Sequence, residues 1–199
     1  MWSQPTLLDG VVDVAEAGPF APERIELDGT SWVELHRGWL RGADHALADL
    51  LSNLSWYGGE RVVYHQRFVE PRLSAGFHDP GRHPVTASMA EALADRYDRP
   101  FHDVFCNQYR DGDDAVAWHR DRIHRRDAEP LVAILTLGAT RTFSLRPHGG
   151  GPSVRLRPAS GDLLVMGGAC QHDWEHAVLR TRRPVGVRVS VTLRSIAPG

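Results

Sequence analysis

Lysine is absent from this 199-residue chain, and cysteine is nearly so. All 23 basic residues are arginine, and the formal net charge is only −2. Because arginine is the only strong base, a single Arg indicates no site by itself, and so small a charge does not establish binding to nucleic acid. Two cysteines, Cys106 and Cys170, are too few for a disulfide framework, and we expect both to be buried free thiols.

Long apolar runs are also missing. No stretch approaches the roughly 20 apolar residues of a membrane-spanning helix. The start Met1–Pro5 lacks the charged segment and apolar run of a secretory signal. We therefore expect a cytoplasmic protein that does not associate with membranes. The length fits one domain over residues 1–199 that can bury a full core.

The first hundred residues differ in pattern from the rest. Asp44–Asn53 and Pro84–Tyr97 place apolar residues at helical spacing and predict two amphipathic helices, whereas residues 73–83 predict a loop. After Pro100 the β-rich runs are Val104–Tyr109, Ala115–Asp121, Leu131–Leu137, Thr140–Arg146, Val154–Arg157, Asp162–Met166, Asp173–Val178 and Val185–Arg194.

Eight such runs are the number expected for a jelly-roll barrel. The predicted fold class is therefore mainly β with flanking helices. We expect a double-stranded β-helix core over about residues 101–199. Residues 1–100 would supply an extension and the helices that brace one face of a sheet.

One β-rich run carries a possible pair of metal ligands. His119 and Asp121 are two residues apart, so their side chains share a face if the run is a strand. A further histidine would complete two imidazoles and one carboxylate, a set that suits Fe(II) and leaves positions open for a cosubstrate and O2. His172 and His176 both qualify, because an extended segment places them on one face. A simple hydrogen bond between a histidine and a carboxylate would explain the pair equally well.

The final β-rich run has two unlike faces. One face is valine and leucine, and the other carries Arg188, Ser190, Thr192 and Arg194. An ordinary half-buried strand would turn this polar face to water. If the polar face instead points inward, two guanidinium groups can hold a dicarboxylate in one cavity. Asn107 and Tyr109, also two residues apart, would add an amide and a phenol to the same interior.

Taken in order, these segments resemble the AlkB-like 2-oxoglutarate- and Fe(II)-dependent dioxygenases that repair alkylated nucleic acid. The resemblance is carried by Asn107–Gly112, Trp118–Asp121, Thr140–Arg146, Gly161–Gly168, Trp174–His176 and Arg188–Arg194. It fades before about residue 60, although Pro71-Arg72 stands where that family often has Pro-Arg ahead of its substrate loop.

The resemblance implies a role for each matching position. The iron ligands would be His119, Asp121 and His176. The 2-oxoglutarate ligands would be Asn107, Tyr109, Arg188 and Arg194. Contacts to the nucleic acid, some from a substrate-recognition lid, would come from Tyr64, Arg72, Phe77 and Arg122. The implied cofactors are Fe(II), 2-oxoglutarate and O2, and the implied partner is alkylated DNA or RNA bound by a monomer.

The implied reaction is oxidative demethylation of bases such as 1-methyladenine and 3-methylcytosine, with release of formaldehyde. One position departs from the family pattern. Many members have an acid two residues after the iron-binding aspartate, where this chain has Ile123. Two alternatives therefore stay open: the same chemistry on a protein side chain or tRNA, and a non-catalytic jelly roll that binds nucleic acid.

Overall fold

Two antiparallel sheets carry most of the computed structural model, which describes residues 13–14, 21–58, 60–63, 66–69, 71–121, 127 and 129–195. The larger sheet has the order β2-β3-β13-β10-β15-β8-β7. Its strands are β2 Glu23–Glu26, β3 Ser31–His36, β13 Leu163–Gly168, β10 Val132–Gly138, β15 Arg188–Ser195, β8 Phe101–Tyr109 and β7 Leu73–Phe77. We call it the major sheet.

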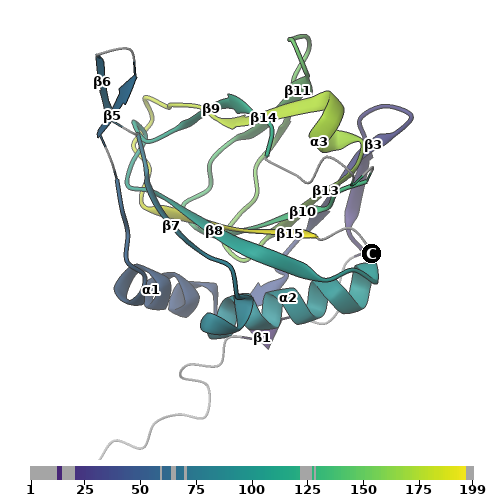
Figure 1. Ribbon diagram of the computed structural model, residues 1–199, viewed down its shortest axis with the longest axis horizontal. Helices are drawn as coiled ribbons and strands as arrows, with labels where there is room; N and C mark the ends of the chain where they lie inside the picture. Colours follow the sequence, from purple (N-terminus) through teal and green to yellow (C-terminus); the bar gives the residue numbers. More distant parts are fainter. Residues whose placement is uncertain are drawn as a thin grey trace, which may run out of the picture.

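The second sheet, the minor sheet, has the order β12-β11-β14-β9. Its strands are β12 Val154–Leu156, β11 Phe143–Pro147, β14 Trp174–Val178 and β9 Val116–His119. The minor sheet lies across from the major sheet in Figure 1. Two small pairs complete the strands: β1 Asp13–Val14 with β4 Leu40–Arg41, and the hairpin β5 Glu60–Val63 with β6 Gln66–Val69.

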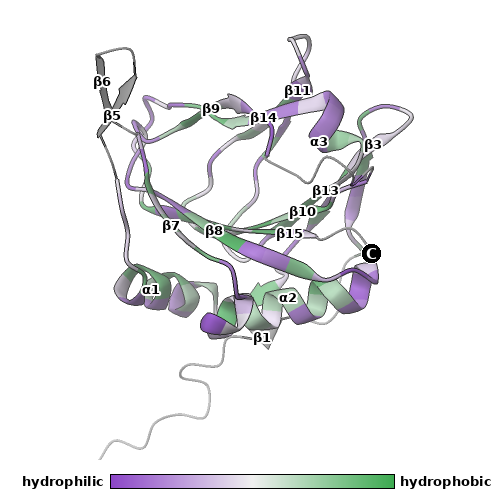
Figure 2. Ribbon diagram, in the orientation of Figure 1, coloured by the Kyte–Doolittle hydropathy of each residue, from purple (hydrophilic) through white to green (hydrophobic). Residues whose placement is uncertain are grey.

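Two helices, α1 Ala43–Asn53 and α2 Pro84–Tyr97, cover the outer face of the major sheet (Figure 1). Helix α2 begins at a proline, which suits the first helical turn, and the ring of His83 accepts the Val85 N–H at 3.3 Å. Figure 2 shows apolar and hydrophilic residues along both helices, and the buried apolar ones belong to the cluster that packs on this sheet. Leu50 and Met89 are fully buried there, in one cluster with Val191 of β15.

A second apolar cluster fills the space between the two sheets. Val33 and Ile134 of the major sheet pack with Phe143, Leu145 and Trp174 of the minor sheet. Strand β15 therefore has its apolar face on the helices and its other face toward the barrel interior. This arrangement follows from strict alternation along a strand.

The structure confirms the mainly β fold with bracing helices, and each of the eight predicted β-rich runs contains a strand. Residues 73–83 were wrongly predicted as a loop, because Leu73–Phe77 forms β7 and Pro80–Arg82 forms a short 3-10 helix, η1. The β7 sequence is rich in small residues and has weak strand propensity. Pairing with β8 along its whole length imposes the strand, as tertiary context often does.

Both cysteines are buried free thiols, as predicted. Burial raises the pKa of the Cys106 thiol, and likewise that of Cys170, to about 12. Within the described part of the chain, no helix has the length and apolar character needed to cross a membrane.

The helix-to-sheet contact gives a stability prediction. Met89→Ala should lower the free energy of unfolding by about 2–5 kcal/mol, because it opens a cavity at a fully buried site. Urea denaturation followed by circular dichroism measures the change. Glu91→Ala, an exposed change on the same helix, should stay within about 0.5 kcal/mol of wild type. An equal loss in both variants would show that α2 does not pack as described.

Candidate metal centre and cosubstrate cavity

Three side chains of metal-binding type meet on the inner side of the minor sheet. His119 and His176 are directly opposed on β9 and β14, which brings their ring centroids to 4.3 Å. Asp121 follows β9, and its Oδ2 is 4.0 Å from His176 Nε2. One ligand atom from each residue lies within 4.8 Å of the others.

Asp121 reaches this point by a route that strand alternation does not describe. We expected it on the same strand as His119, but β9 ends at His119. The backbone N–H of Asp121 instead donates to Gln171 Oε1 at 3.1 Å, and Arg194 Nη2 donates to Asp121 Oδ1 at 3.0 Å. Side-chain partners therefore orient the carboxylate in place of the β9 ladder.

Both histidines present a free nitrogen lone pair to the cluster. His119 Nδ1 is 2.9 Å from the Ala117 carbonyl oxygen, which only an N–H can satisfy, so Nε2 is left as the ligand atom. The ring of His176 stacks on Phe143 with centroids 5.2 Å apart. Burial lowers the pKa of His176 to about 4, so this imidazole is neutral at neutral pH.

The Asp121 carboxylate is ionised and incompletely satisfied. Burial acts to raise the pKa of Asp121, but attraction to His176 in its protonated form, together with the charge and hydrogen bond of Arg194, outweighs burial and holds the pKa below its usual value. Its Oδ2 is buried and has no hydrogen-bond partner among the residues that the structure describes, which is costly for an acceptor. A cation held by this oxygen and the two imidazoles removes that cost, so the donor set fits Fe(II).

His172, the other candidate for third ligand, lies elsewhere. It belongs to a short helix, α3 Cys170–Asp173, rather than to an extended segment. Its Nε2 is 3.0 Å from the carbonyl oxygen of Asp127, and its own carbonyl accepts a bond from Arg120 Nη1 at 2.7 Å. Among the residues that the structure describes, the cluster of metal-binding type contains His176 and not His172.

A cavity of about 890 Å³ opens beside this cluster, between the two sheets. The polar face of β15 lines it through Arg188, Ser190, Thr192 and Arg194, which is the inward orientation of the two that the sequence left open. Asn107 and Tyr109 of the neighbouring strand β8 also line it. The four proposed cosubstrate residues and the three proposed metal ligands thus share one cavity.

Arg188 is a buried cation without an anionic partner among the described residues. It is 1% exposed, and one of its nitrogens donates to Thr136 Oγ1 at 3.1 Å. Its Nε and Nη1 are buried and make no hydrogen bond to any residue in the described part of the chain. Its Cζ is 5.1 Å from the centroid of the Tyr109 ring. Since an unpaired buried charge is strongly unfavourable, the site fits a carboxylate of 2-oxoglutarate.

Arg141 lies buried near Tyr109, one of the residues that line the cavity. Our sequence interpretation gave Arg141 no role. It is 3% exposed, and its guanidinium donates to the carbonyl oxygens of Asp111 at 2.7 Å, Asp114 at 3.1 Å and Leu179 at 2.8 Å. Its Cζ is 5.9 Å from the Tyr109 ring, which therefore lies near two guanidinium groups. Because every basic residue of this chain is arginine, nothing in the sequence distinguishes Arg141 from an arginine on the surface.

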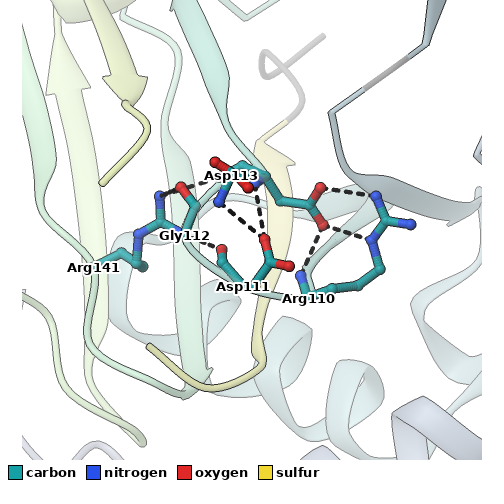
Figure 3. Close-up of polar contacts among 6 residues, drawn as sticks. Arg110, Asp111, Gly112, Asp113 and Arg141 are labelled. Carbon is teal, nitrogen blue, oxygen red and sulfur yellow. Dashed lines mark hydrogen bonds and ion pairs between the residues drawn. The ribbon is translucent and has the colours of Figure 1, made fainter. Parts of the chain in front are cut away.

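Figure 3 shows Arg141 on one side of the turn at residues 111–114 and Arg110 on the other. Arg110 Nε donates to Asp114 Oδ2 at 2.8 Å, which closes the turn. Gly112 is required where this turn meets the loop after β14. A Cβ at that position would lie 2.4 Å from the Thr181 carbonyl oxygen.

Of the four residues proposed to contact nucleic acid, the structure places one at the cavity, one away from it, and leaves two outside the described residues. Arg72 lines the cavity, and its Nε donates to Asn107 Oδ1 at 2.7 Å. Phe77 does not line the cavity but packs with the helix-side cluster. On β7 the inward residue is Ser74, and Phe77, an odd number of positions away, faces the opposite side. Tyr64, Arg122 and the position of Ile123 lie outside the described residues.

The sequence matches the 2OG-Fe(II) oxygenase superfamily over residues 42–194, which is most of the chain. The chain belongs to that superfamily. A 2OG-Fe(II) oxygenase uses Fe(II), 2-oxoglutarate and O2, in accord with the donor set and the uncompensated arginine described above.

This 2OG-Fe(II) oxygenase is similar to alpha-ketoglutarate-dependent dioxygenase alkB homolog 3. Identity is 30% with the Mus musculus protein and 29% with the Homo sapiens protein, each over 194 residues that cover 85% of this chain and 68% of the relative. It is also 29% identical over 123 residues to DNA oxidative demethylase ALKBH2 of Mus musculus, covering 58% of this chain and 52% of that protein.

A solved structure supports the fold. An oxidoreductase of the 2OG-Fe(II) oxygenase family from Burkholderia pseudomallei aligns with a TM-score of 0.52 at 16% identity, covering 77% of this chain and 79% of that one.

The cluster gives a prediction on metal binding. His119→Ala should remove a ligand, abolish tight binding of Mn(II) used as a redox-stable substitute for Fe(II), and leave the circular dichroism spectrum unchanged. Isothermal titration calorimetry measures the affinity. His172→Ala is the matched control, because it changes a nearby histidine outside the cluster. Equal loss in both variants, or normal binding by His119→Ala, would contradict the assignment.

Proposed function

We propose that this protein oxidatively demethylates alkylated bases in DNA, of the 1-methyladenine and 3-methylcytosine type, and so acts in repair of alkylation damage. Alkylated RNA is a second proposed substrate for the same reaction. The observation that carries the proposal is one cavity faced by His119, Asp121 and His176 on one wall and by the uncompensated Arg188 on another. The names of its relatives, a DNA oxidative demethylase among them, support the choice of substrate.

In this proposal His119 Nε2, His176 and the free Oδ2 of Asp121 hold the iron. When bound, the iron supplies activation of O2 coupled to decarboxylation of 2-oxoglutarate to succinate and CO2. Arg194 donates to Asp121 Oδ1 and so keeps the other oxygen of that carboxylate directed at the metal position.

The proposed cosubstrate residues neutralise the charge of 2-oxoglutarate and hold it in a fixed orientation. Arg188 neutralises one carboxylate of 2-oxoglutarate in a site that excludes water, where a charge-assisted hydrogen bond is strong. Tyr109 is held in place by the guanidinium groups near its ring. Asn107 is held by Arg72, which bonds its side-chain oxygen and leaves the amide N–H groups for the cosubstrate.

The balance of the reaction accounts for both oxygen atoms. One atom of O2 enters a C–H bond of the N-methyl group, and the other enters succinate as 2-oxoglutarate loses CO2. The resulting N-hydroxymethyl group breaks its C–N bond: the bonding electron pair returns to the ring nitrogen, the hydroxyl proton is released, and the carbon leaves as formaldehyde. A base in a duplex must leave the stack to reach such a cavity, so the substrate is a flipped or single-stranded nucleotide.

Arg188→Ala should raise the KM for 2-oxoglutarate by about 30-fold or more, because the cosubstrate carboxylate loses a buried charged partner. Steady-state succinate formation at varied 2-oxoglutarate measures it. Arg155→Ala, an exposed arginine on β12, should keep the wild-type KM. A wild-type KM in the Arg188 variant would remove that residue from the cosubstrate site.

The function itself is tested with oligonucleotides that contain a single 1-methyladenine or 3-methylcytosine, single-stranded and duplex, and with RNA of the same sequence. We expect formaldehyde and the unmodified base in equal amounts, both dependent on Fe(II) and 2-oxoglutarate. Turnover of 2-oxoglutarate with no repaired base in any oligonucleotide would reject the proposal. That outcome would favour a protein side chain or tRNA as the target, the alternative that Ile123 keeps open.

A further inference from the structure

Strand β9 carries a proposed metal ligand but has little backbone support. It is four residues long and ends the minor sheet, with β14 as its one neighbour among the described strands. It pairs with β14 at two positions, and the register shifts between them. The ring of His119 is oriented by the Ala117 carbonyl of the same strand, 2.9 Å from Nδ1. The direction of this ligand therefore follows the position of β9 as a whole.

A contact on the outer face of the minor sheet reaches this strand. Trp118 precedes His119, so the two side chains lie on opposite faces of the strand. The Cζ of Arg146 is 4.1 Å from the centroid of the Trp118 ring, which is a cation–π contact. Arg146 belongs to β11, and β14 lies between β11 and β9 in the sheet. The guanidinium therefore spans one strand to contact the strand at the edge.

Glu175 of the intervening strand β14 fixes that guanidinium. Arg146 and Glu175 are directly opposed in the sheet, and Arg146 Nε donates to Glu175 Oε1 at 2.5 Å. The Glu175 side chain is 12% exposed, so solvent and salt screen this pair less than they screen an open surface pair. His148 Nδ1 lies 3.7 Å from the other carboxylate oxygen. We call Arg146, Glu175 and Trp118 the outer row, because together they link three strands.

The outer row backs onto the metal centre. Trp118 is next to His119 in β9, and Glu175 is next to His176 in β14, so each of these two row members adjoins a proposed ligand that faces the other way. His119 and His176 are themselves directly opposed. A displacement of β9 relative to β14 on the outer face is therefore also a displacement of one imidazole relative to the other.

We propose that Trp118 and Arg146 are positioning residues for the metal centre: Arg146, held by Glu175, fixes the indole and with it the strand that carries His119. Neither residue touches the metal. The inference rests on the ligand assignment within the proposed function, and it holds whichever substrate the enzyme takes. Loss of the outer row should weaken metal binding although all three ligands are present.

A second arginine–tryptophan contact provides a matched control. The Cζ of Arg24 is 4.2 Å from the centroid of the Trp32 ring, and Arg24 Nη1 is 3.1 Å from Glu34 Oε1. This contact joins β2 and β3, and neither strand contributes a described residue to the cavity lining. Arg24→Ala thus removes the same kind of contact at a place remote from the metal centre.

Titration calorimetry with Mn(II) provides the first test. Arg146→Ala should weaken Mn(II) binding about 10-fold, the lower end of the effect of groups that orient metal ligands. Trp118→Leu, which keeps apolar bulk and removes the π face, should give a similar loss. Trp118→Phe should stay within about threefold of wild type, because a smaller ring still accepts the cation. Arg24→Ala should bind Mn(II) as the wild type does.

Two results in this series would overturn the inference. One is wild-type Mn(II) affinity in Arg146→Ala, and the other is an equal loss in Arg24→Ala, which would indicate general destabilisation. The double variant Arg146→Ala with Trp118→Leu should bind Mn(II) no more weakly than either single variant, because both changes remove one shared contact. Additive losses would show that Arg146 does not act through Trp118 and would reject the proposed link.

Amide hydrogen exchange without metal measures the position of the strand itself. Arg146→Ala should speed exchange across Val116–His119, while exchange in the central strand β10 stays as in the wild type. Unchanged protection of β9 would overturn the inference. Faster exchange throughout both sheets would also overturn it, because the outer row would then serve stability rather than ligand position.

Metal binding requires no nucleic acid, which keeps this inference distinguishable from the proposed function. Mn(II) binding that depends on Arg146, without base repair by the wild-type enzyme, would reject the proposed function and retain the role of the outer row. Repair by the wild type with unchanged Mn(II) affinity in Arg146→Ala would reject the outer row alone. Normal Mn(II) binding by His119→Ala would reject the ligand assignment and this inference with it.

Discussion

Strand β15 is the constraint on which the rest of the structure depends. It pairs with β10 on one side and β8 on the other, so its register is fixed from both directions. Its odd-numbered residues, such as Val191, pack against the helices, and its even-numbered residues from Arg188 to Arg194 line the cavity. A slip of one residue would bury two guanidinium groups under the helices and place valine in the cavity. The core and the site are therefore specified by the same eight residues.

The folded chain carries charges whose partners the described residues do not supply. Arg188 has two buried nitrogens without a hydrogen bond, and Asp121 has one such oxygen. These groups have opposite signs and lie in one cavity, yet Asp121 is paired with Arg194 rather than with Arg188. A cation and a dicarboxylate together satisfy both. Because such ligands bind only the folded state, they also stabilise it by mass action.

Much of this could be predicted from the sequence, for reasons that particular residues make clear. The spacing of Leu50, Met89 and Leu93 predicted the helices, and the alternation in β15 predicted which side chains share a face, but not which of the two faces points inward. Both signals are periodic and local. The sequence pattern alone left His172 and His176 as equal candidates for the third metal ligand. His172 lies in α3, and a helix of four residues is too short to be recognised from the spacing of its apolar residues.

What the sequence could not show depends on contacts between distant segments. Strand β7 forms because β8 is beside it, and Asp121 is directed by Gln171 and Arg194 rather than by its own strand. Arg141 is recognisable only once the carbonyl groups around it are in place. The same holds for Trp118, which meets Arg146 across an intervening strand. None of these relations leaves a pattern in the sequence near the residue concerned.

The placement of the two cysteines has a consequence for an enzyme that handles iron and oxygen. Such chemistry exposes a protein to oxidants that attack thiolates. Burial raises the pKa of Cys106 and of Cys170 to about 12, so both are thiols at neutral pH. Cys106 lies on the helix side of β8, opposite the cavity wall formed by its neighbour Asn107. Burial therefore keeps both sulfurs in the thiol form, which reacts with peroxide far more slowly than a thiolate does.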